Sequence, residues 1–316
     1  MPDIVISEFM DEAAIQDGLA GFDVLYDPDL VDRTDDLRAA LGDARSLIVR
    51  NRTQVRGALL DAGRNLRAIG RLGVGLDNID VEACRGRGIA VYPATGANDV
   101  SVAEYVIATA MVLLRGAYVA TGEVVAGAWP RGRLISGREI SGKRLGLIGY
   151  GSIARETARR ATALGMIVCG HDPFVAPDDP AWIQPWGRAE PVGLSQLLEL
   201  SDVISLHVPL TADTRNLLDA RHLGMCKPGA IVINAARGGV VDEAALAVAL
   251  KAGALGGAAL DVFDAEPLSA ERGAVFAGCP NLILTPHIAG VTAEANVRVS
   301  SVTAENIRRH LAALPA

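Results

Sequence analysis

The sequence of 316 residues has few aromatic side chains and no concentrated run of basic residues. Only 4% of the residues are aromatic while half are hydrophobic, so Ala, Val, Leu and Ile must fill the core. The net charge is -7 without a Lys/Arg tract, which argues against nucleic acid as a partner because binding phosphates needs a concentrated basic surface. Any anion-binding site must therefore consist of a few local arginines.

Cysteine pairs, leader segments and long apolar runs are also missing. The N-terminus lacks a basic segment followed by an apolar stretch, so no signal peptide is expected. The most apolar long window, residues 100–114, is interrupted by Glu104 and is short for a membrane span. We expect a cytoplasmic protein with no membrane partner. Scattered cysteines predict reduced, buried side chains and no metal site; they are Cys84, Cys169, Cys226 and Cys279.

What the sequence does contain is a repeated alternation of short apolar runs and helical patterns. The length predicts two lobes, and strand–helix alternation predicts parallel sheets with right-handed crossovers. A long helix is expected over residues 102–115, a last helix over 292–311, and an irregular surface loop over 178–191. Strands are expected over 4–7, 23–26, 47–49, 66–69, 89–91, 145–148, 166–169, 203–206, 230–234, 258–260 and 282–284.

A glycine-rich segment follows the predicted strand at 145–148 and precedes a predicted helix. Its pattern is Gly-x-Gly-x-x-Ala, in which Gly149 permits a tight turn, Gly151 leaves room for a pyrophosphate and Ala154 allows close helix packing. Asp172 ends the next strand, 23 residues after Gly149. A carboxylate there would accept hydrogen bonds from ribose hydroxyls and favour NAD over NADP. The alternative is that Asp172 only caps a loop.

Three polar segments each follow an apolar strand of the second lobe. They are residues 234–239, 260–267 and 285–290. His287 suits proton transfer, Glu266 could hold one imidazole nitrogen, and Arg237 offers a planar fork to a carboxylate. Each residue taken alone could be structural. Their shared position after strands of one lobe predicts reduction of a 2-keto acid, or the reverse.

Longer motifs around these residues resemble a known family. Residues 234–243 (NAARGGVVDE), 258–263 (AALDVF) with Glu266-Pro267, and Thr285-Pro-His287 are similar to signatures of the D-isomer-specific 2-hydroxyacid dehydrogenases. Residues 71–80 (RLGVGLDNID), 102–104 (VAE) and 207–209 (HVP) add to the resemblance, which covers nearly the whole chain. The departure is Ala154, where many members have glycine.

The resemblance implies two Rossmann-like, flavodoxin-like doubly wound parallel-sheet domains of the α/β class, with the active site in the cleft between them. The substrate domain would comprise 1–99 plus 289–316, and the NAD-binding domain 100–288, through which a homodimer would form. Arg237, Glu266 and His287 would be catalytic, and Val74, Gly75 and Arg237 would hold the substrate carboxylate. The implied cofactor-binding residues are Gly149, Gly151, Ser152, Ile153, Asp172, His207, Val208, Pro209, Ala235, Ala236, Arg237, Asp261, His287, Ile288, Ala289 and Gly290.

The substrate is less clearly indicated. Residues 49–53 (VRNRT) resemble the phosphoglycerate dehydrogenase subfamily, in which an arginine at the place of Arg50 meets the distal anion of the substrate. Arg131 and Arg133 could add positive charge, although all three could be solvated surface residues. Residues 4–11 resemble a sulfolactate dehydrogenase subgroup. Phosphoglycerate and (S)-3-sulfolactate, which carries sulfonate in place of phosphate, are therefore both expected.

Other functions stay open at this point. A generic D-hydroxy acid or hydroxypyruvate/glyoxylate is a third choice of substrate. Formate dehydrogenases of the same superfamily pair His with Gln, so Glu266 argues against that branch. An NAD(H)-sensing corepressor and a merely structural dinucleotide-binding protein are alternatives of a different class. The combination of Arg237, Glu266 and His287 favours an enzyme over both.

Overall fold

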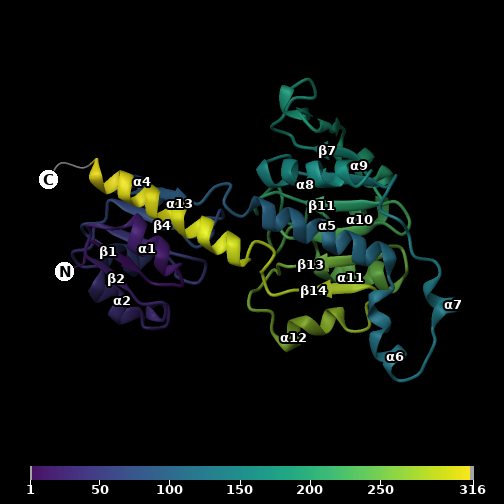
Figure 1. Cartoon of the computed structure of the whole chain (residues 1–316), viewed down its shortest axis with the longest axis horizontal. Coiled ribbons are helices and arrows are strands. Elements are labelled where there is room, and N and C mark those ends of the chain that lie inside the picture. The colour runs from purple at the N-terminus through teal and green to yellow at the C-terminus, as the bar shows by residue number, and fades with distance from the viewer. Residues whose placement is uncertain (1, 314–316) are drawn as a thin grey trace. The chain divides into compact units, whose positions relative to one another are not determined.

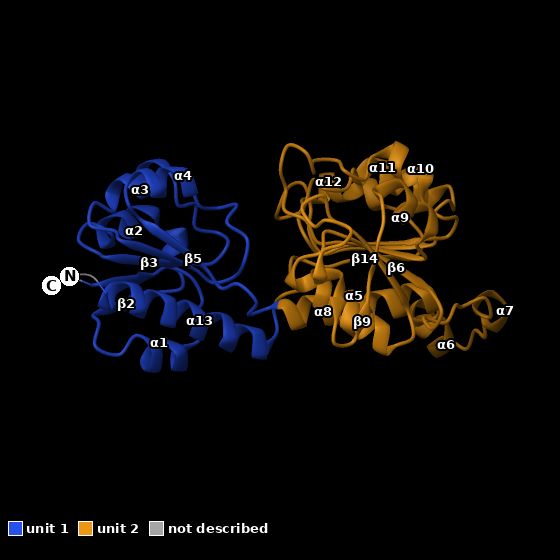
Figure 2. Ribbon diagram, turned by 90° about the horizontal axis from the view of Figure 1, so that it is seen from above, with its two compact units in different colours: residues 1–98, 291–316 blue, residues 99–290 orange. Residues whose placement is uncertain are grey.

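A computed structural model describes residues 2–313. The chain forms two compact units, distinguished by colour in Figure 2. Unit 1 consists of Met1–Asn98 and Val291–Ala316, and unit 2 consists of Asp99–Gly290. The α/β class is confirmed, because both units contain a parallel sheet with helices on its two faces.

Unit 1 is built on a parallel sheet with the strand order β2-β1-β3-β4-β5. The helices α2, α3 and α4 cover one face, and α1 and α13 cover the other (Figure 2). A Cβ at Gly70 would lie 2.7 Å from Thr303 Cγ2, so glycine lets α13 pack closely on β4. The elements are β1 (Ile4–Ile6), α1 (Glu12–Gly18), β2 (Val24–Tyr26), α2 (Thr34–Ala40), β3 (Ser46–Val49), α3 (Gly57–Ala62), β4 (Ala68–Arg71), α4 (Val81–Gly86), β5 (Ala90–Pro93) and α13 (Ala293–Ala312).

Unit 2 contains a parallel sheet with the order β10-β7-β6-β11-β12-β13-β14. The residues of its four central strands, from β6 to β13 in that order, are nearly all buried and mostly apolar, as expected of a sheet covered on both faces. The strands are β6 (Arg144–Ile148), β7 (Ile167–His171), β10 (Glu190–Pro191), β11 (Val203–Leu206), β12 (Ile231–Asn234), β13 (Gly257–Leu260) and β14 (Leu282–Leu284).

The helices of unit 2 divide between the two faces of this sheet (Figure 2). One apolar core lies under α5 and α8, and the other lies under α9, α10 and α11. The 17-residue α5 begins where unit 2 begins, and α6 and α7 follow it (Figure 1). The helices are α5 (Asp99–Arg115), α6 (Thr121–Val125), α7 (Arg131–Leu134), α8 (Ser152–Ala163), α9 (Leu194–Leu200), α10 (Ala220–Met225), α11 (Glu243–Lys251) and α12 (Ala270–Gly273).

The expectation that residues 178–191 form an irregular loop is wrong, although most of them are exposed as expected. This segment contains a short 3-10 helix (Pro180–Trp182), a hairpin of β8 (Ile183–Gln184) and β9 (Gly187–Arg188), and the edge strand β10. Trp182 is 1% exposed and its ring stacks on Tyr150 at 4.2 Å between centroids. Gly170 makes this possible, since a Cβ there would lie 2.7 Å from the indole. The frequent Pro and Gly residues predicted an irregular loop, but the segment is ordered by burial of the Trp182 ring.

The cysteines of residues 2–313 form no disulfide bond and belong to no cluster of metal ligands. The cysteines are free; Cys84, Cys169 and Cys226 are buried as expected, whereas Cys279 is only partly buried. In the described part of the chain, no His, Cys, Asp or Glu side chains cluster as metal ligands. No single helix among residues 2–313 has the length and apolarity to cross a membrane, although α5 and residues 118–125, bent by 71°, pass that test as a pair.

Candidate active site

The glycine loop between β6 and α8 has the geometry that a pyrophosphate requires. Gly149 has φ +87°, and a Cβ there would lie 2.4 Å from the carbonyl oxygen of His207. Gly151 is the N-cap of the 12-residue α8, and the space where its Cβ would stand is open. No side chain among the described residues caps α8, so its first N–H groups, including those of Ser152 and Ile153, can bind phosphate oxygens. These residues fit a dinucleotide.

Asp172 is tied to this loop by backbone hydrogen bonds. Its Oδ2 accepts from the Tyr150 N–H at 2.8 Å, and its Oδ1 accepts from the Phe174 N–H at 2.9 Å. Asp172 therefore caps the loop, which was the alternative to a role in binding ribose. Each carboxylate oxygen has a second acceptor position, so capping leaves the carboxylate able to accept bonds from ribose hydroxyls. The Tyr150 ring, stacked on Trp182, anchors the same loop in the core.

The segment 207–209 follows β11 and adjoins the glycine loop. The His207 N–H donates to the Ile148 carbonyl at 2.7 Å, and its Nε2 lies 3.0 Å from Ser205 Oγ. Burial lowers the pKa of His207 to about 4, so this imidazole is neutral at pH 7. His207 is therefore unsuited to supplying a cation to the phosphates.

His287 and Glu266 come together as a hydrogen-bonded pair. The Nδ1 of His287 donates to Glu266 Oε2 at 2.7 Å, and Glu266 Oε1 accepts from the Phe263 N–H at 3.0 Å. Burial raises the pKa of the Glu266 carboxyl, but the bonds from His287 and Phe263 outweigh it, so the pKa lies below its usual value. Both side chains remain about one-third exposed, at 37% and 32%. The pair can therefore meet a substrate while Glu266 stays ionised.

Arg237 lies on the loop after β12, which is pressed against the segment that carries Glu266. A Cβ at Gly238 would lie 1.8 Å from the Phe263 carbonyl oxygen, so glycine is required for this approach. The charge of Arg237 contributes to lowering the pKa of Glu266, after the larger effects of His287 and Phe263. Sequence reasoning assigned no role to Asn234. Its side chain receives the Ala236 N–H and donates to the Arg237 carbonyl, and so shapes this loop.

Asp261 directly follows β13 and organises the loop that bears His287. Its Oδ1 accepts from the Ile288 N–H at 2.8 Å, and its Oδ2 accepts from the Ala289 N–H at 2.7 Å. Its carbonyl oxygen accepts from the His287 N–H at 2.8 Å. Ala235, Ala236 and Gly290 are partly buried in the loops that follow β12 and β14. The candidate residues of unit 2 thus follow adjacent strands of one sheet, where open α/β sheets bind ligands.

In unit 1, Arg50 lies on a loop shaped by a buried carboxylate. Glu8, which is 4% exposed, accepts hydrogen bonds from the N–H groups of residues 50–53. The Arg50 side chain donates from Nη2 to Asn296 Oδ1 at 2.8 Å, and burial lowers its pKa although Glu8 opposes this. The sequence analysis did not identify Glu8 as important. The signal that could have done so is its position directly after the predicted strand 4–7.

The remaining predicted residues lie in two other places. Val74 and Gly75 are partly exposed in the loop after β4 of unit 1. Arg131 and Arg133 are exposed on α7 of unit 2, and Arg133 is paired with Glu123 of α6. No hydrogen bond or ion pair among residues 2–313 joins Arg131 or Arg133 to the residues around His287.

Comparison with known proteins identifies the family. The family described as "D-isomer specific 2-hydroxyacid dehydrogenase, NAD binding domain" matches residues 107–289. The chain belongs to this family. It is an NAD-dependent oxidoreductase that acts on the CH–OH group of a 2-hydroxy acid, a small-molecule substrate.

Individual relatives extend the likeness over the whole chain. The dehydrogenase is 55% identical to an (S)-sulfolactate dehydrogenase of Chromohalobacter salexigens over 98% of this chain and 99% of that protein. It is 42% identical to a D-3-phosphoglycerate dehydrogenase of Archaeoglobus fulgidus over 85% of this chain, which spans 50% of that protein. A solved structure from Thermus thermophilus matches with a TM-score of 0.83 and 32% identity, covering 98% and 96% of the two chains.

Proposed function

We propose that the dehydrogenase interconverts (S)-3-sulfolactate and its 2-keto acid with NAD(H). The observation that carries the proposed chemistry is the His287–Glu266 hydrogen bond of 2.7 Å beside the loop of Arg237. The likeness to a sulfolactate dehydrogenase over nearly the full length of both chains supports this substrate. 3-Phosphoglycerate is the second candidate, supported by the relative from Archaeoglobus fulgidus. Both are three-carbon acids with a second anionic group.

His287 is the acid/base in this proposal. Its Nδ1 is occupied by Glu266, which leaves Nε2 to exchange a proton with the oxygen on C2 of the substrate. Glu266 is ionised and stabilises the imidazolium that forms when the hydroxy acid is oxidised. Arg237 binds the substrate carboxylate, assisted by the N–H groups of Val74 and Gly75. Bound NAD supplies the hydride acceptor.

The cofactor residues follow from the same loops. Gly149, Gly151, Ser152 and Ile153 would hold the pyrophosphate, and Asp172 the adenosine ribose. We assign the nicotinamide half to the loops after β11, β12, β13 and β14. These loops contribute His207, Val208, Pro209, Ala235, Ala236, Arg237, Asp261, His287, Ile288, Ala289 and Gly290.

Arg50 is proposed to bind the sulfonate or phosphate of the substrate. Its guanidinium has one hydrogen bond, to Asn296, so the other N–H groups have no hydrogen-bond acceptor among residues 2–313 and can receive an anion. Its partial burial strengthens such an interaction, because charges attract more strongly when water is excluded. The hydrogen bonds from backbone N–H groups to Glu8 hold this loop. They thereby fix the backbone position from which the Arg50 side chain extends.

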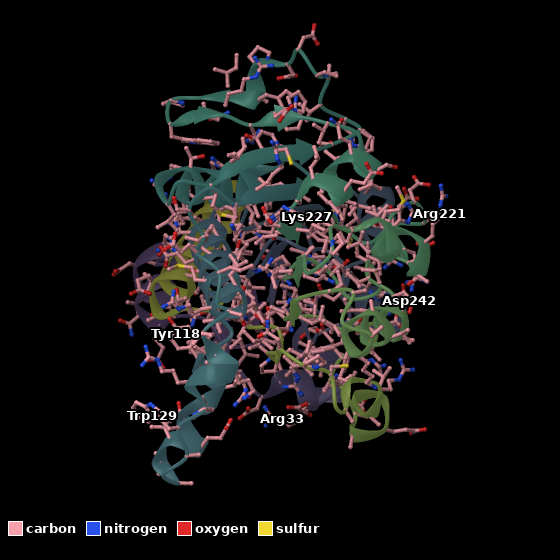
Figure 3. All side chains as sticks on the ribbon, turned by 90° about the vertical axis from the view of Figure 1, so that its right-hand side faces the viewer. Arg33, Tyr118, Trp129, Arg221, Lys227 and Asp242 are labelled. Carbon is pink, nitrogen blue, oxygen red and sulfur yellow. The ribbon has the colours of Figure 1, made fainter. Side chains whose placement is uncertain are left out.

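A homodimer formed through unit 2 is the proposed assembly. Residues 117–137, here called the arm, carry exposed apolar side chains that include Val125, 84% exposed, and Trp129, 79% exposed. Figure 3 labels Tyr118 and Trp129 on this segment. An apolar surface of this kind is typical of a protein interface. Trp129→Ser should shift the protein to monomer in analytical ultracentrifugation, whereas Ile183→Ser, at an exposed side chain outside the arm, should not.

A substrate panel tests the proposed reaction. Sulfolactate, 3-phosphoglycerate, glycerate and lactate are each assayed with NAD by absorbance at 340 nm, and kcat/KM values are compared. We expect sulfolactate to give the highest value and lactate to give the lowest. A preference for lactate or glycerate would contradict the requirement for a second anionic group. Absence of turnover with every acid, in protein that still binds NADH, would contradict the enzymatic proposal itself.

A further inference from the structure

Helix α5 is connected to the loop of His287 by a chain of hydroxyl groups. The phenol oxygen of Tyr105 lies 2.6 Å from Thr285 Oγ1, and Thr285 Oγ1 lies 2.6 Å from Asp261 Oδ1. Tyr105 belongs to α5, Thr285 directly follows β14, and Asp261 directly follows β13. Tyr105 and Thr285 are 180 residues apart in the sequence. None of the chemistry proposed above uses either hydroxyl.

The charge of Asp261 fixes the direction of both hydrogen bonds. An ionised carboxylate only accepts, so the Thr285 hydroxyl must donate its hydrogen to Asp261 Oδ1. That hydroxyl then has no hydrogen left for Tyr105, and the phenol must donate to Thr285 Oγ1. Burial raises the pKa of Tyr105 although the bond to Thr285 opposes this, so the phenol retains its proton across the physiological range.

Asp261 connects these hydroxyl groups to the backbone around His287 by hydrogen bonds. It receives the N–H groups of Ile288 and Ala289 with its side chain and that of His287 with its carbonyl oxygen. His287 has φ +56°, in the left-handed region that residues with a Cβ rarely adopt. Such a conformation persists when surrounding contacts enforce it. The bonds of Asp261 supply that enforcement.

We propose that Tyr105 and Thr285 are positioning residues that hold His287 in its reactive orientation through Asp261. This inference rests on the proposed role of His287 as the acid/base. Without the Thr285 hydroxyl, Asp261 Oδ1 loses one of its two donors and the carboxylate can rotate. The N–H groups of Ile288 and Ala289 then lose an acceptor of fixed position. The loop is no longer held, and the imidazole of His287 moves away from the substrate. Displacement of a catalytic group by about 1 Å can lower the rate about a hundredfold.

The test compares isosteric removals of hydroxyl groups. Thr285→Val and Tyr105→Phe remove the two members of the chain, and Thr285→Ser restores the first hydroxyl. Thr109→Val is the matched control, because Thr109 lies on the same helix and its hydroxyl bonds only to helix carbonyl oxygens at Tyr105 and Val106. For each variant, kcat and KM for the 2-keto acid, the Kd for NADH and Tm are measured.

We expect kcat to fall roughly 10–100-fold in Thr285→Val and about 3–10-fold in Tyr105→Phe, with KM and the NADH Kd within about twofold of wild type. Thr285→Ser should recover most of kcat. Thr109→Val should keep kcat whatever its effect on Tm. The inference is overturned if Thr285→Val and Tyr105→Phe lower kcat no more than Thr109→Val does, or if the NADH Kd rises by the same factor as kcat falls.

A double variant separates this inference from the proposed function. If the hydroxyl chain acts through His287, Thr285→Val should barely lower the residual activity of His287→Ala, since residues that act as a unit are not additive. A full multiplicative loss in the double variant would refute the positioning role while leaving His287 as acid/base. Wild-type turnover in His287→Ala alone would instead refute the proposed function.

Discussion

In unit 1 the loop after β3 is shaped by one buried carboxylate that binds only backbone N–H groups, whereas in unit 2 side chains from several strands bond to one another. Glu8 holds the backbone of the loop that carries Arg50 and does not bond to its side chain, whereas Glu266 holds the ring of His287 directly. Two parallel sheets of similar design therefore contribute differently. Under the proposed function, unit 2 would supply the proton chemistry and unit 1 a fixed charge for selectivity. Variants in unit 2 should lower kcat, and variants in unit 1 should change the ranking of substrates.

The largest expected effect is that of His287→Ala in unit 2. Removing the acid/base should lower kcat by roughly 10²–10⁴-fold, since that is the usual contribution of general acid–base catalysis. The NADH Kd, measured by fluorescence titration, should change little because the glycine loop is intact. If His287→Ala kept the wild-type kcat, the assignment of the proton chemistry to unit 2 would be wrong.

Arg50→Ala in unit 1 is the complementary experiment. Loss of a charge-assisted contact should lower kcat/KM for sulfolactate and 3-phosphoglycerate by roughly 10–100-fold and leave lactate unchanged. Arg52→Ala is the control, because Arg52 is a neighbouring exposed arginine already paired with Asp32. Equal losses for lactate and for the dianionic acids would contradict a role of unit 1 in selectivity.

A smaller effect is expected for Asp172→Ala, which tests whether the loop cap also selects the cofactor. Without the carboxylate, the preference of kcat/KM for NAD over NADP should fall roughly tenfold, through lost ribose bonds and relief of repulsion toward the 2′-phosphate. Asp179→Ala removes a similar cap, to the Ala181 N–H, outside the glycine loop and should leave the preference intact. If both variants keep the wild-type preference, Asp172 is only structural.

The last prediction concerns stability and not catalysis: it is the pH dependence of the free energy of unfolding, measured without NAD. The pKa of His207 is about 4 in the folded protein and ordinarily 6.5. Between these values the unfolded chain binds more protons, so the free energy of unfolding falls as pH falls from 6.5 through 4, by up to about 3 kcal/mol. Urea unfolding of His207→Asn should show a weaker decline over this window. An unchanged pH profile would show that His207 is not the titrating group.

The sequence foretold those parts of the site that depend on local patterns. A strand, two glycines and a helix in succession predict a tight turn, and the segment with Gly149 and Gly151 forms one. The pairing of His287 with Glu266 was foreseen because both follow strands of one lobe. The bond between Tyr105 and Thr285 was not, since a hydrogen bond between residues 180 positions apart leaves no periodic signal.

By itself the sequence determined the α/β class, the approximate positions of the strands and the chemical types of side chain available at their ends. Periodicity and glycine spacing carry this information because they follow from backbone geometry. Only the tertiary structure decided that Trp182 is buried against Tyr150, that Glu8 binds four successive N–H groups and that Tyr105 reaches Thr285. Those contacts depend on which strands become neighbours, and neighbouring strands are joined by hydrogen bonds between residues distant in the chain.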